Sequence, residues 1–172
     1  DIGCYTLAAG PPYNAMNSCV CMGASFSVGH GAQQAFDRAG INKRVVAVLG
    51  DSTFFHTGIN SLLNTVYNKS RTISVILDNR ITAMTGHQNN PGSGFTAKGE
   101  PAGEIQIEPL VKAMGIKHVR VVVPNDLDAV DKALDELIAI DEASVLITRW
   151  PCVLKKFSEE DINEFEAVSY TH

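Results

Sequence analysis

Short apolar runs alternate along the chain with segments in which apolar residues recur at helical spacing. The runs are rich in β-branched residues, and they predict strands at residues 45–49, 73–77, 119–123 and 145–147. The first two runs are almost continuously apolar, which is typical of central parallel strands that are buried on both faces. The periodic segments predict helices at residues 24–38, 59–67, 108–114 and 126–140.

This alternation predicts an α/β fold with a doubly wound, mainly parallel sheet of the flavodoxin-like kind. A chain of 172 residues is long enough for one domain with its own core, so we assign residues 1–172 to a single domain. Residues 80–103 interrupt the pattern with five glycines and two prolines. A long loop without structure inside a compact domain is a functional lid or a disordered segment, and we favour a lid-like loop.

Composition and charge exclude several classes of protein. Hydrophobic residues make up 45% and charged residues 19% of the chain, which excludes a disordered chain, and no apolar run approaches the ~20 residues of a membrane span. The net charge is −5, and the acidic excess lies beyond Asn125. Because no clustered Lys and Arg residues are available to neutralise phosphates, we expect no nucleic-acid partner. The lack of a long apolar run leads us to expect no membrane partner.

The ends and the cysteines of the chain give two further expectations. The chain opens at Asp1 without an initiator Met or a targeting peptide, which indicates a fragment of a larger subunit. Four cysteines without a secretory signal indicate thiols or metal ligands in a reducing cytoplasm.

Polar residues follow the first two predicted strands, where open parallel sheets bind their ligands. Asp51 follows one strand and Asn79 follows the other. A carboxylate, an amide oxygen and a nearby main-chain carbonyl would offer the hard oxygen ligands that Mg²⁺ prefers. Gly50 and the hydroxyls and amides of Ser52 and Thr53 could then hold a diphosphate. The alternative is ordinary turn chemistry, with Asp51 or Ser52 acting only as a helix cap.

The span from Gly50-Asp51-Ser52 to Asn79 resembles the thiamine diphosphate motif, which begins Gly-Asp-Gly and ends in Asn; here Ser stands at the third position. Longer phrases are similar to the C-terminal thiamine-binding module of the α subunit of indolepyruvate:ferredoxin oxidoreductases, a branch of the 2-oxoacid:ferredoxin oxidoreductase superfamily. The resemblance covers nearly the whole chain. Its phrases are Asp-Ile-Gly-Cys-Tyr-Thr (1–6), Cys-Val-Cys-Met-Gly-Ala-Ser (19–25), Gly-Asp-Ser-Thr-Phe-Phe-His (50–56) and Asn-Arg-Ile-Thr-Ala-Met-Thr-Gly-His-Gln (79–88).

The resemblance implies a site for thiamine diphosphate and Mg²⁺. The magnesium ligands would be Asp51, Asn79 and the main-chain carbonyl of Ile81. The diphosphate, the thiazolium and the aminopyrimidine would be contacted by a larger set. This cofactor-binding set is Gly3, Cys4, Met22, Gly23, Ala24, Ser25, Gly50, Asp51, Ser52, Thr53, Asn79, Thr82, Ala83, Met84 and Thr85.

Cysteines and histidines add candidates. Cys4 and Cys152 resemble two positions at which relatives ligate a [4Fe–4S] cluster; two thiolates cannot complete such a site, and the alternative is two small buried thiols. We expect Cys19 and Cys21 to be core or pocket-wall residues. Two histidines beside the cofactor motifs, His56 and His87, are suited to moving protons at the cofactor, and a structural role is the alternative for both.

The resemblance also implies an activity: oxidative decarboxylation of arylpyruvates such as indolepyruvate, with CoA taking the acyl group and ferredoxin the electrons. The full enzyme would need a pyrimidine-binding domain, a second subunit and further cysteines from outside this chain to complete the iron–sulfur site, in a cytoplasmic oligomer. A pyruvate-type oxidoreductase or a decarboxylase is the alternative enzyme, and the decarboxylase should lack the equivalents of Cys4 and Cys152. From another class, a non-catalytic flavodoxin-like interaction module would use Asp51 only as a cap.

Overall fold

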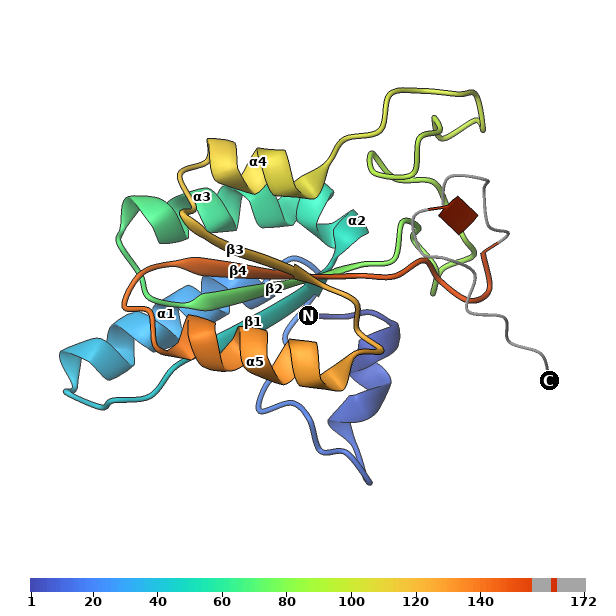
Figure 1. Ribbon diagram of the computed structural model, residues 1–172. Coiled ribbons are helices and arrows are strands. Elements are labelled where there is room, and N and C mark those ends of the chain that lie inside the picture. The colour runs from blue at the N-terminus through green and yellow to red at the C-terminus, as the bar shows by residue number, and fades with distance from the viewer. Residues whose placement is uncertain (156–161, 164–172) are drawn as a thin grey trace.

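The computed structural model describes residues 1–155 and 162–163, and its centre is a four-stranded sheet (Figure 1). All strand pairs are parallel, in the order β1-β2-β4-β3. The strands are β1 (Val46–Gly50), β2 (Ile73–Asp78), β3 (His118–Val122) and β4 (Ser144–Arg149). The predicted α/β fold with a parallel sheet is therefore confirmed.

Four helices lie close to the predicted positions. They are α1 (Ser25–Arg38), α3 (Ile59–Tyr67), α4 (Ile107–Ala113) and α5 (Leu127–Ile138). Asp126 caps α5, because its carboxylate accepts a hydrogen bond of 3.0 Å from the Ala129 amide. Three short helical segments are additional to the prediction: η1 (Cys4–Ala9), α2 (Asp51–Thr53) and the π-helical turn η2 (Phe54–Gly58). The last two join β1 to α3 without a loop.

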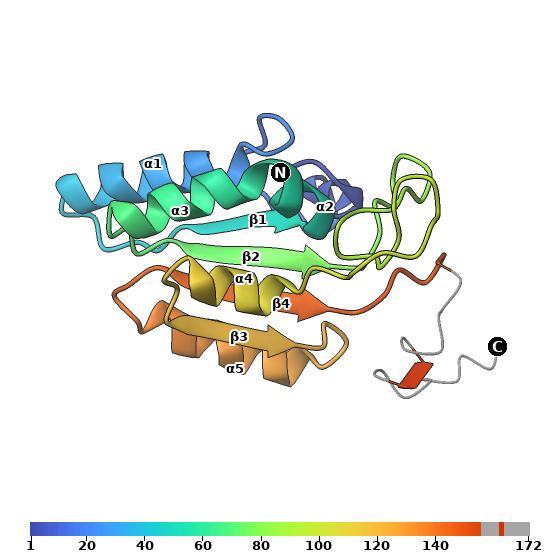
Figure 2. The ribbon, with the colours of Figure 1, turned by 90° about the horizontal axis from the view of Figure 1, so that it is seen from above.

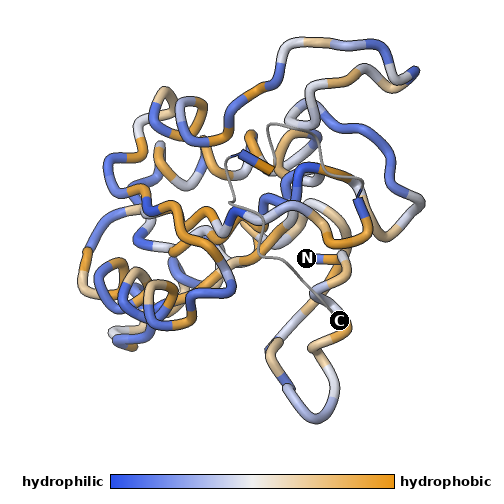
Figure 3. The backbone as a smooth tube through the Cα atoms, turned by 45° about the vertical axis from the view of Figure 1, so that its right-hand side comes forward, coloured by the Kyte–Doolittle hydropathy of each residue, from blue (hydrophilic) through white to orange (hydrophobic). Residues whose placement is uncertain are grey.

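Two apolar clusters hold the helices on opposite faces of the sheet. Phe26 of α1, Leu62 of α3 and Val111 of α4 belong to the larger cluster, together with buried side chains of β1, β2 and β4, and Val119 of β3 packs against it. Leu137 of α5 packs on the other face against Val75 and other residues of the smaller cluster. Figure 1 shows α3 and α4 above the sheet and α5 below it, and in Figure 3 the strands form an apolar centre. Burial on both faces explains why the strand sequences are almost wholly apolar.

The prediction that residues 45–49 form a central strand is wrong. In the described part of the chain β1 pairs only with β2 and lies at the edge of the sheet. Val46 is accordingly 45% exposed, whereas Ile73, its partner on β2, is fully buried. The apolar run reflects contacts of Ala47 and Leu49 with the larger cluster, which a sequence pattern does not distinguish from burial between two strands.

The loop predicted at residues 80–103 is confirmed as irregular: no helix or strand lies between β2 and α4. Two isolated bridges, Thr82 with Gln88 and Phe95 with Pro101, divide it into tight turns. Figure 2 shows this loop, the N-terminal segment and α2 gathered at the same end of the sheet. Its function as a lid stays a prediction. Across the described residues, the helices are all too short or too polar to span a bilayer.

Candidate cofactor site at the carboxyl ends of β1 and β2

The sheet register brings the two motif ends together. Gly50, the last residue of β1, is the partner of Leu77 on β2, so Asp51 and Asp78 leave the sheet side by side. Asn79 follows directly, and the expectation that the two strands are neighbours is confirmed. The candidate site is therefore built where β1 turns into a helix and β2 turns into the long loop.

Asp51 is buried, with 3% of its surface exposed. One carboxylate oxygen, Oδ1, accepts a hydrogen bond of 2.6 Å from the Ser52 amide, and the other, Oδ2, accepts one of 3.1 Å from Nδ2 of Asn90. The main-chain amide of Arg80 also donates to this carboxylate. Burial first, and then the nearby Asp78 carboxylate, raises the pKa of Asp51 to about 7. A divalent cation would relieve both effects by compensating the two negative charges.

The other two predicted magnesium ligands lie in the turn after β2. The side-chain oxygen of Asn79 accepts a hydrogen bond of 3.2 Å from the Ile81 amide, and Ile81 is buried. The donor set is thus a buried carboxylate, an amide oxygen and a main-chain carbonyl. Hard oxygen donors of this kind, too few to enclose an ion, fit Mg²⁺ that also binds phosphate oxygens and water. The residues present therefore fit the expected ion.

Asp78 is held by an ion pair across the sheet. Its Oδ2 lies 2.8 Å from Nε of Arg149, its register partner on β4, and both side chains are largely buried. The residues that follow Arg149 also bond to the turn after β2. The Trp150 amide donates a hydrogen bond to the Asp78 carbonyl, and the Cys152 amide donates one of 3.2 Å to the Asn79 carbonyl. The segment after β4 therefore fixes the main chain on either side of Asn79.

Ser52 and Thr82, two of the predicted diphosphate contacts, are joined by a hydrogen bond of 2.7 Å between their hydroxyls. Thr53 is buried, and its carbonyl accepts a hydrogen bond from the Thr57 hydroxyl one turn later. Ala83, Met84 and Thr85 continue the turn that the Thr82–Gln88 bridge closes. The helix after β1 and the mouth of the loop therefore form one polar surface.

The segment predicted to contact the aminopyrimidine, residues 22–25, lies against the helix after Asp51. Gly23 has φ +89°, and a Cβ built on it would lie 2.3 Å from Oγ1 of Thr57, so only glycine fits there. The Gly23 amide donates a hydrogen bond of 2.7 Å to Oδ1 of Asp1. Met22 is exposed, Ala24 is the N-cap of α1, and Ser25 is the first residue of that helix.

The predicted histidine and cysteine residues do not gather at the Asp51 site in the way that the predicted magnesium ligands do. His56 and His87 are both exposed, His87 in a left-handed conformation, and their catalytic roles stay predictions. Cys4 is exposed and Cys152 is half-buried. The expectation that Cys19 and Cys21 are core residues is wrong, because both are exposed on an irregular segment. Their alternative place in a pocket wall stays a prediction. Within the described residues, no three His, Cys, Asp or Glu side chains are placed to hold a metal ion.

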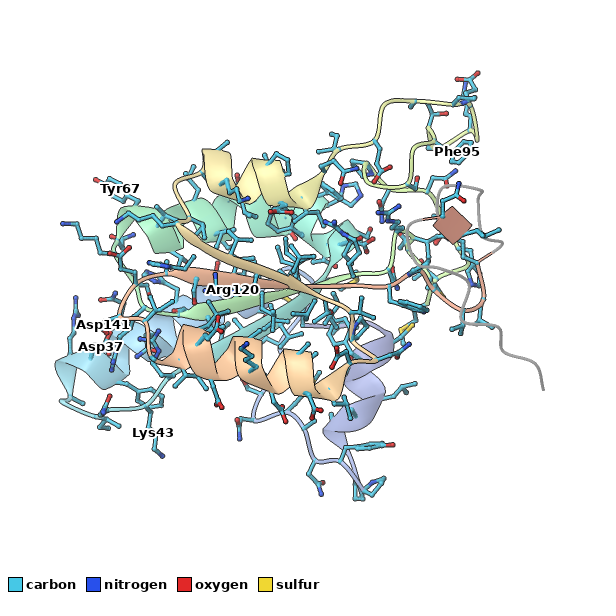
Figure 4. All side chains as sticks on the ribbon, viewed as in Figure 1. Asp37, Lys43, Tyr67, Phe95, Arg120 and Asp141 are labelled. Atoms are coloured by element: carbon cyan, nitrogen blue, oxygen red, sulfur yellow. The ribbon has the colours of Figure 1, made fainter. Side chains whose placement is uncertain are left out.

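A polar pocket of about 420 Å³ lies at the opposite end of the sheet, near the starts of β2 and β4. Three of its charged side chains pair with one another: Nε of Arg71 lies 2.7 Å from Asp37 and Nη1 lies 3.4 Å from Asp141. Figure 4 places Asp37 and Asp141 together, at the end of the molecule away from the loop residue Phe95. This network joins α1, β2 and the end of α5, and it belongs to the scaffold.

Sequence reasoning missed three residues of the site. Asn90 lies in the loop without a motif around it, and Arg149 ends a strand that has no predicted ligand. The third is Tyr5, whose hydroxyl accepts a hydrogen bond of 3.2 Å from the Gly50 amide. Tyr5 belongs to one of the phrases that carried the family resemblance, which is the one signal that pointed to it.

Comparisons with known proteins agree with this geometry. The chain is 42% identical to "Indolepyruvate oxidoreductase subunit IorA" of Thermococcus kodakarensis, over 92% of this chain and 26% of that protein. It is 41% identical to the subunit of the same name from Methanothermobacter thermautotrophicus, over 90% of this chain and 24% of that protein. The chain thus spans about a quarter of the length of these relatives. The resemblance to the indolepyruvate branch is confirmed.

Solved structures share the fold at low identity. The 2-oxoglutarate:ferredoxin oxidoreductase from Magnetococcus marinus has a TM-score of 0.70 at 16% identity, covering 83% of this chain and 50% of that one. Benzoylformate decarboxylase from Polynucleobacter necessarius has a TM-score of 0.57 at 22% identity, covering 79% and 25%. Residues 1–148 match the family model described as "Thiamine pyrophosphate enzyme, C-terminal TPP binding domain". The motif residues lie together at the carboxyl ends of β1 and β2, and the family model matches most of the chain. The chain therefore belongs to this family of thiamine diphosphate-binding domains.

Proposed function

We propose that this chain is the thiamine diphosphate- and Mg²⁺-binding module of a ferredoxin-dependent oxidoreductase that oxidatively decarboxylates arylpyruvates such as indolepyruvate. The observation that carries the proposal is the buried Asp51 carboxylate beside Asn79 at the ends of two paired strands. The identity of 40–42% to the IorA subunits supports the choice of substrate class.

Each part of the site has a role in this proposal. Asp51, Asn79 and the carbonyl of Ile81 hold the ion, which neutralises the diphosphate. The hydroxyls of Ser52 and Thr82, already bonded to each other, turn toward the diphosphate oxygens. Bound thiamine diphosphate supplies the carbon nucleophile that decarboxylates 2-oxoacids. His56 and His87, both exposed at the ends of the motifs, are the proposed proton carriers.

Other functions belong to parts outside this chain. We propose that the chain is a portion of a larger cytoplasmic subunit, because it spans about a quarter of its curated relatives. A pyrimidine-binding domain would supply a glutamate that activates the aminopyrimidine of the cofactor, and a second subunit, CoA and ferredoxin would complete the reaction in an oligomer. Cys4 and Cys152 are proposed to contribute to a [4Fe–4S] cluster with cysteines from outside the chain.

Calorimetry tests the cofactor assignment. The chain, mixed with its pyrimidine-binding partner, is titrated with thiamine diphosphate in the presence of Mg²⁺ and again in EDTA. We expect binding that requires Mg²⁺ and that Asp51→Asn abolishes. Asp128→Asn, which neutralises an exposed carboxylate on α5, is the matched control and should bind like the wild type. Unchanged binding in Asp51→Asn would refute the metal site, and no binding by the wild type would favour a non-catalytic interaction module.

A second experiment tests the substrate. The anaerobic holoenzyme is offered indolepyruvate, phenylpyruvate, pyruvate and 2-oxoglutarate with CoA, and the reduction of ferredoxin is followed. We expect the arylpyruvates to have the highest kcat/KM. Preference for pyruvate would indicate a pyruvate-type oxidoreductase, and release of aldehyde without ferredoxin reduction would indicate a decarboxylase.

A further inference from the structure

Tyr5 lies against the end of β1 at the point where the predicted diphosphate contacts begin. It belongs to η1, far from the motif in sequence, yet its hydroxyl accepts a hydrogen bond of 3.2 Å from the Gly50 amide. The ring covers the same residue: its Cε1 atom lies 3.8 Å from the position of a Cβ on Gly50. The phenol is therefore fixed at the first residue of the Gly50-Asp51-Ser52 turn.

The Tyr5 hydroxyl has a hydrogen to donate. A phenol oxygen that accepts one hydrogen bond still carries its own O–H, which is a donor. Within residues 1–155 and 162–163 no acceptor receives that hydrogen. An ordinary phenol, with a pKa of about 10, keeps this hydrogen at neutral pH.

Gly3 and Thr6, on either side of Tyr5, allow its ring to lie against the end of β1. A Cβ on Gly3 would lie 2.5 Å from Cε1 of the Tyr5 ring, so a side chain at residue 3 would push the ring away from β1. The hydroxyl of Thr6 accepts a hydrogen bond of 2.8 Å from the Gly3 amide and donates one to the Asp1 carbonyl, which closes the turn that carries Tyr5. Gly3, expected as a direct cofactor contact, thus has a second use in admitting the Tyr5 ring.

From these contacts we infer that the Tyr5 hydroxyl is a cofactor-binding group. It donates a hydrogen bond to a diphosphate oxygen and at the same time accepts one from the Gly50 amide. The inference rests on the proposed function, since it places the diphosphate beside Gly50 and Ser52. It adds a neutral donor to a site in which the other predicted diphosphate contacts come from the turn and helix after β1 and from the mouth of the loop. A hydrogen bond to a charged oxygen is stronger than one between neutral groups, so its loss should be measurable.

The test compares Tyr5→Phe with the wild type by calorimetry, each chain mixed with its pyrimidine-binding partner, using Mg²⁺ with inorganic pyrophosphate and Mg²⁺ with thiamine diphosphate as probes. Tyr13→Phe, which removes an exposed hydroxyl from the same segment, is the control. We expect the Kd of both probes to rise about tenfold in Tyr5→Phe and to stay unchanged in Tyr13→Phe. An unchanged Kd in a folded Tyr5→Phe would overturn the inference and leave the proposed function intact. Failure of the wild type to bind either probe would overturn both.

A second measurement covers the case in which Tyr5→Phe does not fold. The wild-type chain is labelled with 3-fluorotyrosine, and the ¹⁹F resonances are followed as Mg²⁺ and pyrophosphate are added. We expect the Tyr5 resonance to shift, with the exposed Tyr13 and Tyr67 as internal controls that do not. A Tyr5 resonance that stays in place while pyrophosphate binds would overturn the inference, because a purely structural tyrosine would behave in that way.

Discussion

Nδ2 of Asn90 donates a hydrogen bond of 3.1 Å to Oδ2 of Asp51, although 39 residues separate the two in sequence. The bond joins the middle of the long loop to the carboxylate that we propose as a magnesium ligand. Asn90 is buried, and its Oδ1 also accepts the Gly92 amide at 2.9 Å. One side chain therefore fixes both the loop and the carboxylate.

Asn90→Ala should destabilise the fold. It leaves a carboxylate oxygen and a main-chain amide without these partners, and each lost buried hydrogen bond costs about 1–3 kcal/mol. The free energy of urea unfolding measures the effect. Asn60→Ala, at an exposed position of α3, should change it by less than about 0.5 kcal/mol. Equal stabilities of the two variants would mean that the loop is not held through Asn90.

The stability of the metal-free chain should fall as the pH rises from about 4 to about 7. The pKa of Asp51 is about 7 in the fold against an ordinary value of 3.8, so between these values the folded chain holds a proton that the unfolded chain has lost. Above about pH 8, where Asp51 has lost its proton in the folded chain as well, this group should cause no further change. Unfolding in EDTA across this range should show the decline in the wild type and a smaller one in Asp51→Asn.

Magnesium should reverse that decline. At pH 8 the Asp51 carboxylate is ionised and buried, and a bound cation would stabilise that form. Addition of Mg²⁺ should therefore raise the unfolding midpoint of the wild type but not of Asp51→Asn. A rise of equal size in both proteins would place the ion elsewhere.

Arg149→Met should cost far more stability than Arg120→Met. The Arg149–Asp78 pair has side chains exposed by only 13% and 9%, so removing the cation leaves a buried charge, at about 3–5 kcal/mol. The Arg120–Glu136 pair, with Arg120 labelled in Figure 4, has nearly the same N–O distance, 2.9 Å. Both of its side chains are 42% exposed, and such pairs contribute about 0–1 kcal/mol. The double variant Asp78→Asn/Arg149→Met should recover part of the loss; similar losses for the two single variants would contradict this account.

Two glycines of α1 should respond in opposite directions to alanine. A Cβ on Gly29 would lie 2.7 Å from Cβ of Ala47 on β1, so Gly29→Ala must push the helix from the sheet, at about 1–3 kcal/mol. Gly31 faces open space, and Gly31→Ala should stabilise the chain by about 0.4–1 kcal/mol. Thermal unfolding of both variants measures the difference, and stabilisation by Gly29→Ala would show that the helix is free to move outward.

The sequence by itself determined the fold class, the irregular loop and the pairing of the first two strands. These features follow from local properties: apolar runs of strand length, helical periodicity, and a glycine-rich interruption. The phrases around Asp51 and Asn79 also determined the family, because the motif is defined by residue types and by their separation along the chain, both of which can be read from the sequence.

Only the tertiary structure decided how the site is enclosed. One such feature is the position of β1 at the edge of the sheet. Three others are contacts between residues distant in sequence: the bond from Asn90 to Asp51, the ion pair of Asp78 with Arg149, and the bond from Gly50 to Tyr5. No periodicity or motif encodes such contacts, since they depend on which strand lies beside which and on how the irregular segments fold back. Burial within the fold and the neighbouring Asp78 carboxylate raise the pKa of Asp51, so the charge that would bind the ion is fixed by the fold and not by the motif alone.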